Sequence, residues 1–226
     1  MTPITQTVPL PNGTPNLSGY LAQPSGDGKF PGVVVIHEAF GLNDDIKGIA
    51  GRFAAEGYAA LAVDLFAGRN RAMCMFRFFR GMMFNSLNHP GLNDLKASLT
   101  YLANLPNVDA DRLGAIGFCL GGNFAICWAC TDSRLKVVAP FYGMAPRPLE
   151  AVARACPIVG SYPENDFTTK GARALDAVLD GYDILHDIKI YPDAKHSFFN
   201  HGARYNEAAA QDAWGRTLAF FKQQIG

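Results

Sequence analysis

A cysteine flanked by glycines is the strongest chemical feature of the sequence. The segment Gly117-Phe118-Cys119-Leu120-Gly121 follows an apolar run at 113–118 and precedes a helical pattern at 120–131. It has the GxSxG spacing of a nucleophile elbow, with cysteine in place of serine, in which a sharp strand-to-helix turn exposes the central side chain. We therefore predict that Cys119 attacks a carbonyl and that the amide of Leu120 stabilises the resulting oxyanion. The alternative is that Cys119 is a small buried apolar residue in a tight turn.

A thiol nucleophile needs a base, and the sequence offers one after a suitable strand. In enzymes with such an elbow, the catalytic residues follow one another in the order nucleophile, acid and histidine, and each lies on a loop beyond the carboxyl end of a strand. Asp166 follows the predicted strand 156–162, and His196 follows the predicted strand 186–192. We predict that His196 takes the thiol proton and later protonates the leaving alcohol, while Asp166 orients the imidazole.

Two other polar residues are alternative candidates for the acid and the base. Glu164 is the main rival of Asp166, and His186 is a weaker rival of His196. We expect His89 and His201 to lie on the surface.

The other four cysteines are better explained as packing residues than as functional ones. The chain has five cysteines, an odd number that suits reduced thiols better than a disulfide framework. Cys127 and Cys130 match CxxC, but they fall well inside the predicted helix 120–131, whereas a redox pair begins at the start of a helix. Because there is no second CxxC, no suitably spaced histidine pair and no nucleotide-binding glycine pattern, we expect no metal and no cofactor.

Bulk composition points to an ordinary globular chain. It has 226 residues, 49% of them hydrophobic, with Lys and Arg balancing Asp and Glu at 20 each. This balance gives no electrostatic reason to expect a nucleic acid or membrane partner. The first twenty residues lack a signal-peptide pattern, so we expect a cytoplasmic protein.

The pattern of elements predicts a doubly wound α/β fold. A hairpin with a tight turn at PNGT should open the sheet, and later strands alternate with helices, which favours a mostly parallel sheet covered on both faces. The predicted strands are 4–10, 16–24, 31–39, 58–65, 113–118, 135–143, 156–162 and 186–192. The predicted helices lie between 43 and 57 and near 92–104, 120–131, 169–180 and 206–223. We expect one α/β-hydrolase domain over 1–226, with a possible cap segment at 67–90.

Four motifs together resemble the dienelactone hydrolase family: HEAFGLN at 37–43, GFCLGG at 117–122, the Asp166 loop and HSF at 196–198. The resemblance runs from about Gly32 to the last helix. It implies a carboxymethylenebutenolidase-like hydrolase of lactones or small esters. By the same resemblance, Cys119, Asp166 and His196 form a triad that passes through a covalent acyl-enzyme, and the amides of Leu120 and Ala39 form the oxyanion hole.

The resemblance also assigns a role to Glu38, which is expected to contact the resting thiol and help to activate it when substrate arrives. A carboxylate near a thiol opposes thiolate formation and so protects Cys119 from oxidation. The alternative is a buried carboxylate paired with a structural donor.

The expected substrate site departs from the family pattern. Family members acting on dienelactone carry an arginine shortly after HSF, whereas Phe199 and Asn200 stand here. In the cap segment, Met75, Phe78, Phe79 and Met82 should share one helical face and Arg77 and Arg80 another. We expect Arg77, Arg80 and Asn200 to contact substrate; alternatively, the segment is a packed surface helix or a partner-binding face.

Two functional classes follow. The first is a cysteine-dependent hydrolase that acts on a small-molecule ester or lactone without metal or cofactor. The second is a non-catalytic or thiol-redox protein on the same scaffold.

Overall fold

A computed structural model describes residues 2–226 of the chain. Within helix α2 (Arg71–Asn85), the side chains at 79 and 83–85 are not among those described. The prediction that Phe79 shares a helical face with Met75, Phe78 and Met82 therefore falls outside the described part of the chain.

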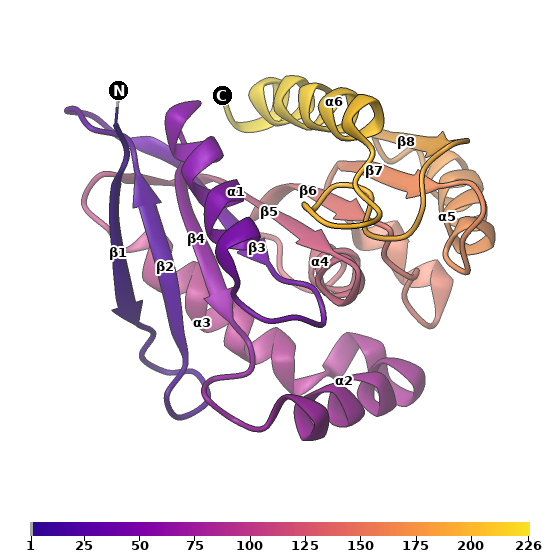
Figure 1. Ribbon diagram of the computed structural model, residues 1–226, viewed down its shortest axis with the longest axis horizontal. Helices are drawn as coiled ribbons and strands as arrows, with labels where there is room; N and C mark the ends of the chain where they lie inside the picture. Colours follow the sequence, from indigo (N-terminus) through magenta and orange to yellow (C-terminus); the bar gives the residue numbers. More distant parts are fainter. Residues whose placement is uncertain (1) are drawn as a thin grey trace.

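The described chain forms an eight-stranded sheet with the order β1-β2-β4-β3-β5-β6-β7-β8 (Figure 1). The strands are β1 (Ile4–Pro9), β2 (Ser18–Gln23), β3 (Phe30–Ile36), β4 (Ala59–Asp64), β5 (Val108–Phe118), β6 (Leu135–Phe141), β7 (Ile158–Pro163) and β8 (His186–Tyr191). β1 and β2 are antiparallel to their neighbours, and the strands from β4 to β8 in this order run parallel. The predicted α/β-hydrolase fold, with its N-terminal hairpin and mostly parallel sheet, is confirmed.

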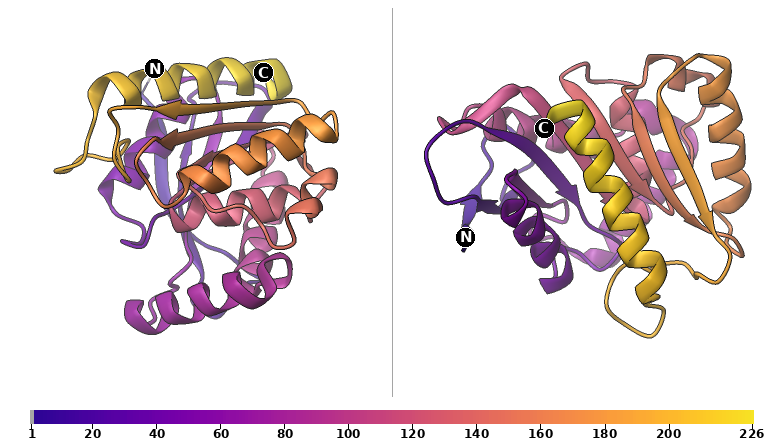
Figure 2. Two further views of the ribbon diagram at one scale, coloured as in Figure 1. Left: turned by 90° about the vertical axis from the view of Figure 1, so that its right-hand side faces the viewer. Right: turned by 90° about the horizontal axis from the view of Figure 1, so that it is seen from above.

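Helices cover both faces of this sheet (Figure 2). The other helices are α1 (Asp44–Ala55), α3 (Pro90–Ala103), α4 (Leu120–Ala129), α5 (Thr169–Gly181), α6 (Glu207–Ile225) and the short 3-10 helices η1 (Ser86–Asn88) and η2 (Leu149–Arg154). Side chains alternate along a strand. Val33 and Val35 therefore pack with α1 and α6, whereas Val34 and Ile36 pack on the opposite face with α3 and α4.

The hairpin differs from the prediction in its turn. β1 and β2 pair as expected, but residues 10–17 form a longer loop that is closed by a hydrogen bond from Leu10 N–H to Leu17 O at 2.9 Å. Asn12 and Asn16 take the positive φ angles, 68° and 65°. The backbone N–H of Thr14 donates to Asp94 at 2.7 Å, so contacts with α3 hold the loop open.

Within the predicted cap segment, α2 carries the expected two faces. Phe78 and Met82 are buried, and Arg77 and Arg80 are exposed. Figure 1 shows α2 set off from the sheet, beyond α4. Phe76 is 71% exposed, so the helix also presents apolar surface to solvent.

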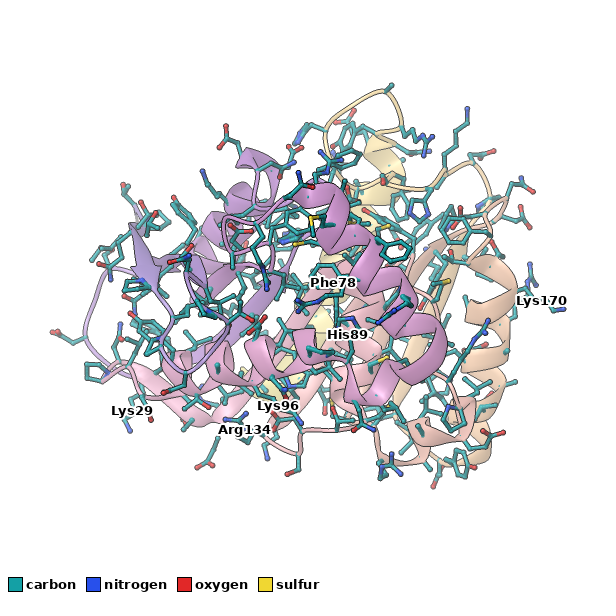
Figure 3. The ribbon with its side chains drawn as sticks, turned by 90° about the horizontal axis from the view of Figure 1, so that it is seen from below. Lys29, Phe78, His89, Lys96, Arg134 and Lys170 are labelled. Carbon is teal, nitrogen blue, oxygen red and sulfur yellow. The ribbon has the colours of Figure 1, made fainter. Side chains whose placement is uncertain are left out.

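The expected surface position of His89 is wrong, because this residue is 2% exposed. Its ring packs edge-on between Phe78 and Phe124, and Figure 3 shows it beside Phe78 under α2. Nδ1 accepts the Gly91 N–H at 2.8 Å, so the ring caps α3. Burial lowers the pKa of His89, which keeps the ring neutral. His201 is exposed, as expected.

No helix among residues 2–226 combines the length and apolar character needed to cross a bilayer.

Candidate active site

Cys119 lies at a strained turn between β5 and α4. Its backbone has φ 52° and ψ −110°, and its N–H donates to Phe141 O at 3.0 Å. A side chain on Gly117 would collide with the backbone of Gly121, and one on Gly121 would collide with Ile36 O. The two glycines are therefore required for the close approach, and the backbone of Cys119 has the geometry of a nucleophile elbow.

Asp166 and His196 meet beyond the carboxyl ends of β7 and β8. His196 Nδ1 lies 2.9 Å from Asp166 Oδ2, and both side chains are largely buried, with exposed fractions of 13% and 6%. The Thr168 hydroxyl donates to the same Oδ2 at 2.5 Å. Burial alone would raise the pKa of Asp166, but hydrogen bonds from Thr168 and His196 bring it below its usual value. The carboxylate therefore stays charged and fixes Nδ1 as the protonated ring nitrogen.

The two rivals lie elsewhere. Glu164 is exposed and faces Arg173 at 4.0 Å. His186 begins β8, so it lies at the opposite end of the parallel strands from Cys119, and its Nε2 contacts Asp176 at 3.2 Å. Asp166 is thus the carboxylate next to His196.

The environment of Cys119 favours a protonated thiol. Burial, followed by the charge of Glu38, raises the pKa of the thiol to about 12. The amide of Leu120 opposes this rise, and Asp166 adds to it. Within residues 2–226, His196 Nε2 takes no hydrogen bond from another side chain, so it is available to act as a base.

Glu38 is held by a residue that the sequence analysis missed. Tyr142 donates its hydroxyl to Glu38 Oε1 at 2.9 Å, and its ring lies 4.9 Å from the His196 ring. Burial and the neighbouring Glu38 hold the pKa of Tyr142 well above its usual value, so it remains a donor. The signal was available, because Tyr142 directly follows β6 at the same edge of the sheet.

His37 fixes the backbone that carries Glu38. Its Nδ1 donates to Glu38 O at 2.6 Å, and its Nε2 accepts the Leu65 N–H at 3.1 Å. This pattern requires a neutral ring, in keeping with the lowering of the His37 pKa by burial.

The N–H groups of Leu120 and Ala39 enter no backbone hydrogen bond of the described turns and caps. Leu120 is the first residue of α4, where unpaired amides and the helix dipole both favour negative charge.

The three residues predicted to contact substrate differ in their exposure. Arg77 and Arg80 lie on the exposed side of α2, and in the described chain neither forms a salt bridge. Asn200 is half-buried, and its Oδ1 has no hydrogen-bond partner among the described residues. Phe167, which the sequence analysis did not single out, stacks on the His196 ring at 4.9 Å and 27°, although it is 70% exposed.

Cys127 and Cys130 are free and buried within and just after α4. Burial raises the pKa of each thiol to about 12. Among the described side chains, no group of three or more histidines, cysteines or carboxylates is arranged to hold a metal ion.

Comparison with known proteins now defines the class. Residues 17–225 match the model of the "Dienelactone hydrolase family". A Synechocystis protein named as a carboxymethylenebutenolidase is 31% identical, with 98% of this chain and 97% of that protein covered. A Bradyrhizobium protein named as a 2-oxo-3-(5-oxofuran-2-ylidene)propanoate lactonase is 30% identical, with 95% and 92% covered. The crystal structure of a Klebsiella pneumoniae protein named as a dienelactone hydrolase superposes with a TM-score of 0.87 at 28% identity, covering 99% of this chain and all of that one.

The fold and these matches define a carboxylic-ester hydrolase of the α/β-hydrolase class. The chain belongs to the dienelactone hydrolase family.

Proposed function

We propose that this enzyme hydrolyses lactones or small esters through Cys119, His196 and Asp166, with a covalent acyl-enzyme as intermediate. The observation that carries the proposal is the 2.9 Å contact between His196 and Asp166 at the end of the sheet where Cys119 occupies a strained elbow. Nucleophile, base and acid also occur in the chain order of the fold.

In the first half of the reaction, His196 Nε2 removes the thiol proton and the sulfur attacks the carbonyl carbon. The amides of Leu120 and Ala39 stabilise the tetrahedral oxyanion. When the intermediate collapses, the carbon–oxygen bond breaks and the imidazolium protonates the leaving oxygen. The products are a thioester on Cys119 and an alcohol, which stays attached as a hydroxyl group when the substrate is a lactone.

In the second half, His196 removes a proton from water, and the resulting hydroxide attacks the thioester. The thiolate leaves and is reprotonated by the imidazolium, which releases the acid and restores the resting enzyme. Asp166 keeps its charge throughout and stabilises the imidazolium.

Glu38 acts as a gate on thiol ionisation in this proposal. In the resting state its charge and the burial of the site hold the thiol pKa at about 12, which protects the sulfur from oxidation. Binding of substrate next to Glu38 and Tyr142 changes this environment and makes transfer of the proton to His196 favourable.

The substrate proposal rests on relatives and on one departure from them. Two relatives are named as a carboxymethylenebutenolidase and a lactonase, which supports lactone chemistry. Asn200 offers hydrogen bonds but no fixed positive charge, so we propose that neutral esters and lactones are turned over at least as well as anionic ones. Arg77 and Arg80, on a cap formed by α2, are the residues that would supply a charge to an anionic substrate. The single catalytic unit over 1–226 and a reducing, cytoplasmic setting belong to the same proposal, since Cys119 must stay reduced.

Alkylation tests this proposal. Stoichiometric labelling of Cys119 by iodoacetamide should abolish turnover of a small activated ester, in proportion to the fraction labelled. Full turnover after complete labelling would reject the nucleophile.

A further inference from the structure

A pocket of about 590 Å³ lies beside the proposed catalytic residues, on the side covered by α2 and α5. Its walls come from the end of α2, from α4, from the segment between β6 and η2, and from the start of α5. In Figure 3, α2 crosses the front of the molecule, and Lys170 marks α5 to its right. A pocket of this volume holds a ligand much larger than a small lactone ring.

The pocket shares its wall with the catalytic residues. Phe167 lines it and stacks on the His196 ring at 4.9 Å. Thr168 also lines it and hydrogen-bonds to Asp166. The pocket therefore adjoins the proposed acid–base pair through these two lining residues.

The lining is mostly apolar, and three of its polar residues, Ser86, Asn123 and Thr168, are hydrogen-bonded within the described chain, whereas Arg147 and Lys170 bring charged side chains to its edge. Met82, Met144 and Leu149 supply apolar surface. The Ser86 hydroxyl both donates to Arg147 O and accepts from Arg147 N–H at 3.0 Å, which ties the end of α2 to the wall. Asn123 Oδ1 accepts the Met144 N–H, so only its NH₂ group remains to face a ligand.

We infer that this pocket binds an apolar arm, aliphatic or aromatic, on the alcohol side of the ester. The inference rests on the proposed function, because it uses His196 as the group that protonates the leaving oxygen. That oxygen must lie next to the imidazole, and Phe167, which stacks on the imidazole, also forms part of the pocket wall. The acyl group stays on the other side of the scissile bond. The enzyme is therefore selective for esters of longer apolar alcohols.

Two ester series separate the alcohol side from the acyl side. The first contains acetate esters of straight-chain alcohols from methanol to hexanol, and the second contains methyl esters of straight-chain acids of matching length. Because each buried methylene contributes a few-fold, kcat/KM should rise at least about tenfold along the alcohol series and much less along the acyl series.

A pair of variants on α5 tests the location. Ala174 and Ala177 are both exposed on α5, but only Ala174 lines the pocket. Ala174→Trp should fill the pocket and remove most of the gain for hexyl acetate, mainly through KM, while methyl acetate turnover stays within about twofold. Ala177→Trp should leave the whole alcohol series unchanged.

Three outcomes would overturn the inference. They are no gain along the alcohol series, a larger gain along the acyl series, and an equal loss on short and long esters in Ala174→Trp. In each case methyl acetate hydrolysis that still depends on Cys119 leaves the proposed function standing. Loss of that dependence is a separate result, which rejects the proposed function itself.

Discussion

Each end of helix α4 carries a thiol whose pKa is raised by burial, but the surroundings of the two thiols differ. Cys119 precedes the helix and Cys130 follows it, and burial raises the pKa of each thiol to about 12. Cys119 has positive φ, lies near Glu38 and meets the positive end of the helix dipole, whereas Cys130 donates its thiol to Ile126 O at 3.2 Å. Burial therefore does not distinguish a nucleophile from a packing residue. The features that set Cys119 apart are its positive φ angle, the nearby charge of Glu38 and the N-terminus of the helix.

Removing each sulfur gives the largest expected contrast. Cys119→Ala should lower kcat for a small ester by about 10⁴-fold or more, because nucleophile and base act as a unit. Cys130→Ala should keep kcat within about twofold. Cys119→Ser should also fall far below wild type, since an alkoxide is much harder to form than a thiolate. Steady-state kinetics of the purified variants measure this, and wild-type activity in Cys119→Ala would remove the distinction between the two ends.

The next contrast compares Asp166, the proposed partner of His196, with a nearby exposed carboxylate. Asp166→Asn should lower kcat by about 10² to 10⁴-fold, because the amide no longer fixes the imidazole tautomer. Glu164→Gln, two residues earlier and exposed, should leave kcat nearly unchanged. Equal losses in the two variants, at equal stability by thermal unfolding, would mean that the loop is structural and that Asp166 has no special role.

A charge at position 200, next to Phe199, which stacks on Phe118 of the elbow, should affect selectivity, whereas a change of charge beside Cys130 should not. A charge-assisted contact contributes about 1.5 to 3 kcal/mol, so Asn200→Arg should raise kcat/KM for a carboxylate-bearing lactone by about tenfold or more over a neutral ester. Arg154, whose Nε donates to Cys130 O at 3.3 Å, provides the control as Arg154→Ala. If wild type already prefers the anionic lactone and Arg77→Ala keeps that preference, another cation anchors the substrate.

The smallest expected effect concerns Glu38, the proposed gate on ionisation of the Cys119 thiol. Since the charge of Glu38 raises the pKa of Cys119, Glu38→Gln should lower it and increase the thiolate fraction at neutral pH. Iodoacetamide labelling of Cys119 should then become about three to ten times faster, while Cys130 should label as before. Tyr142→Phe, which keeps the carboxylate and removes its donor, should have a smaller effect. An unchanged or slower rate in Glu38→Gln would assign Glu38 to structure or to direct assistance of ionisation.

The elbow and the element order could be predicted from sequence because both are local. The glycines at 117 and 121 indicate a tight turn in which a larger residue would collide with the backbone. The β-branched runs indicate buried strands. The contacts around the site are not local. Tyr142 reaches Glu38 across 104 positions of sequence, so its place directly after β6 indicates its edge of the sheet but not this partner.

Two errors have the same physical origin. The sequence analysis places His89 at the surface, yet aromatic packing and the cap of α3 bury it. The Asn-Gly sequence at 12–13 suggested a tight turn, yet Asp94 on α3 anchors a longer loop. In both cases a tertiary contact overrode a local preference.

The most direct test of the central claim is the mass of the enzyme during turnover. Rapid acid quenching with a slowly hydrolysed ester, followed by mass spectrometry of the digested protein, should show the acyl group on the peptide that contains Cys119. The adduct should decay at the rate of turnover and be absent in Cys119→Ala. Turnover without any adduct on Cys119, or with a competent adduct on another residue, would contradict the account.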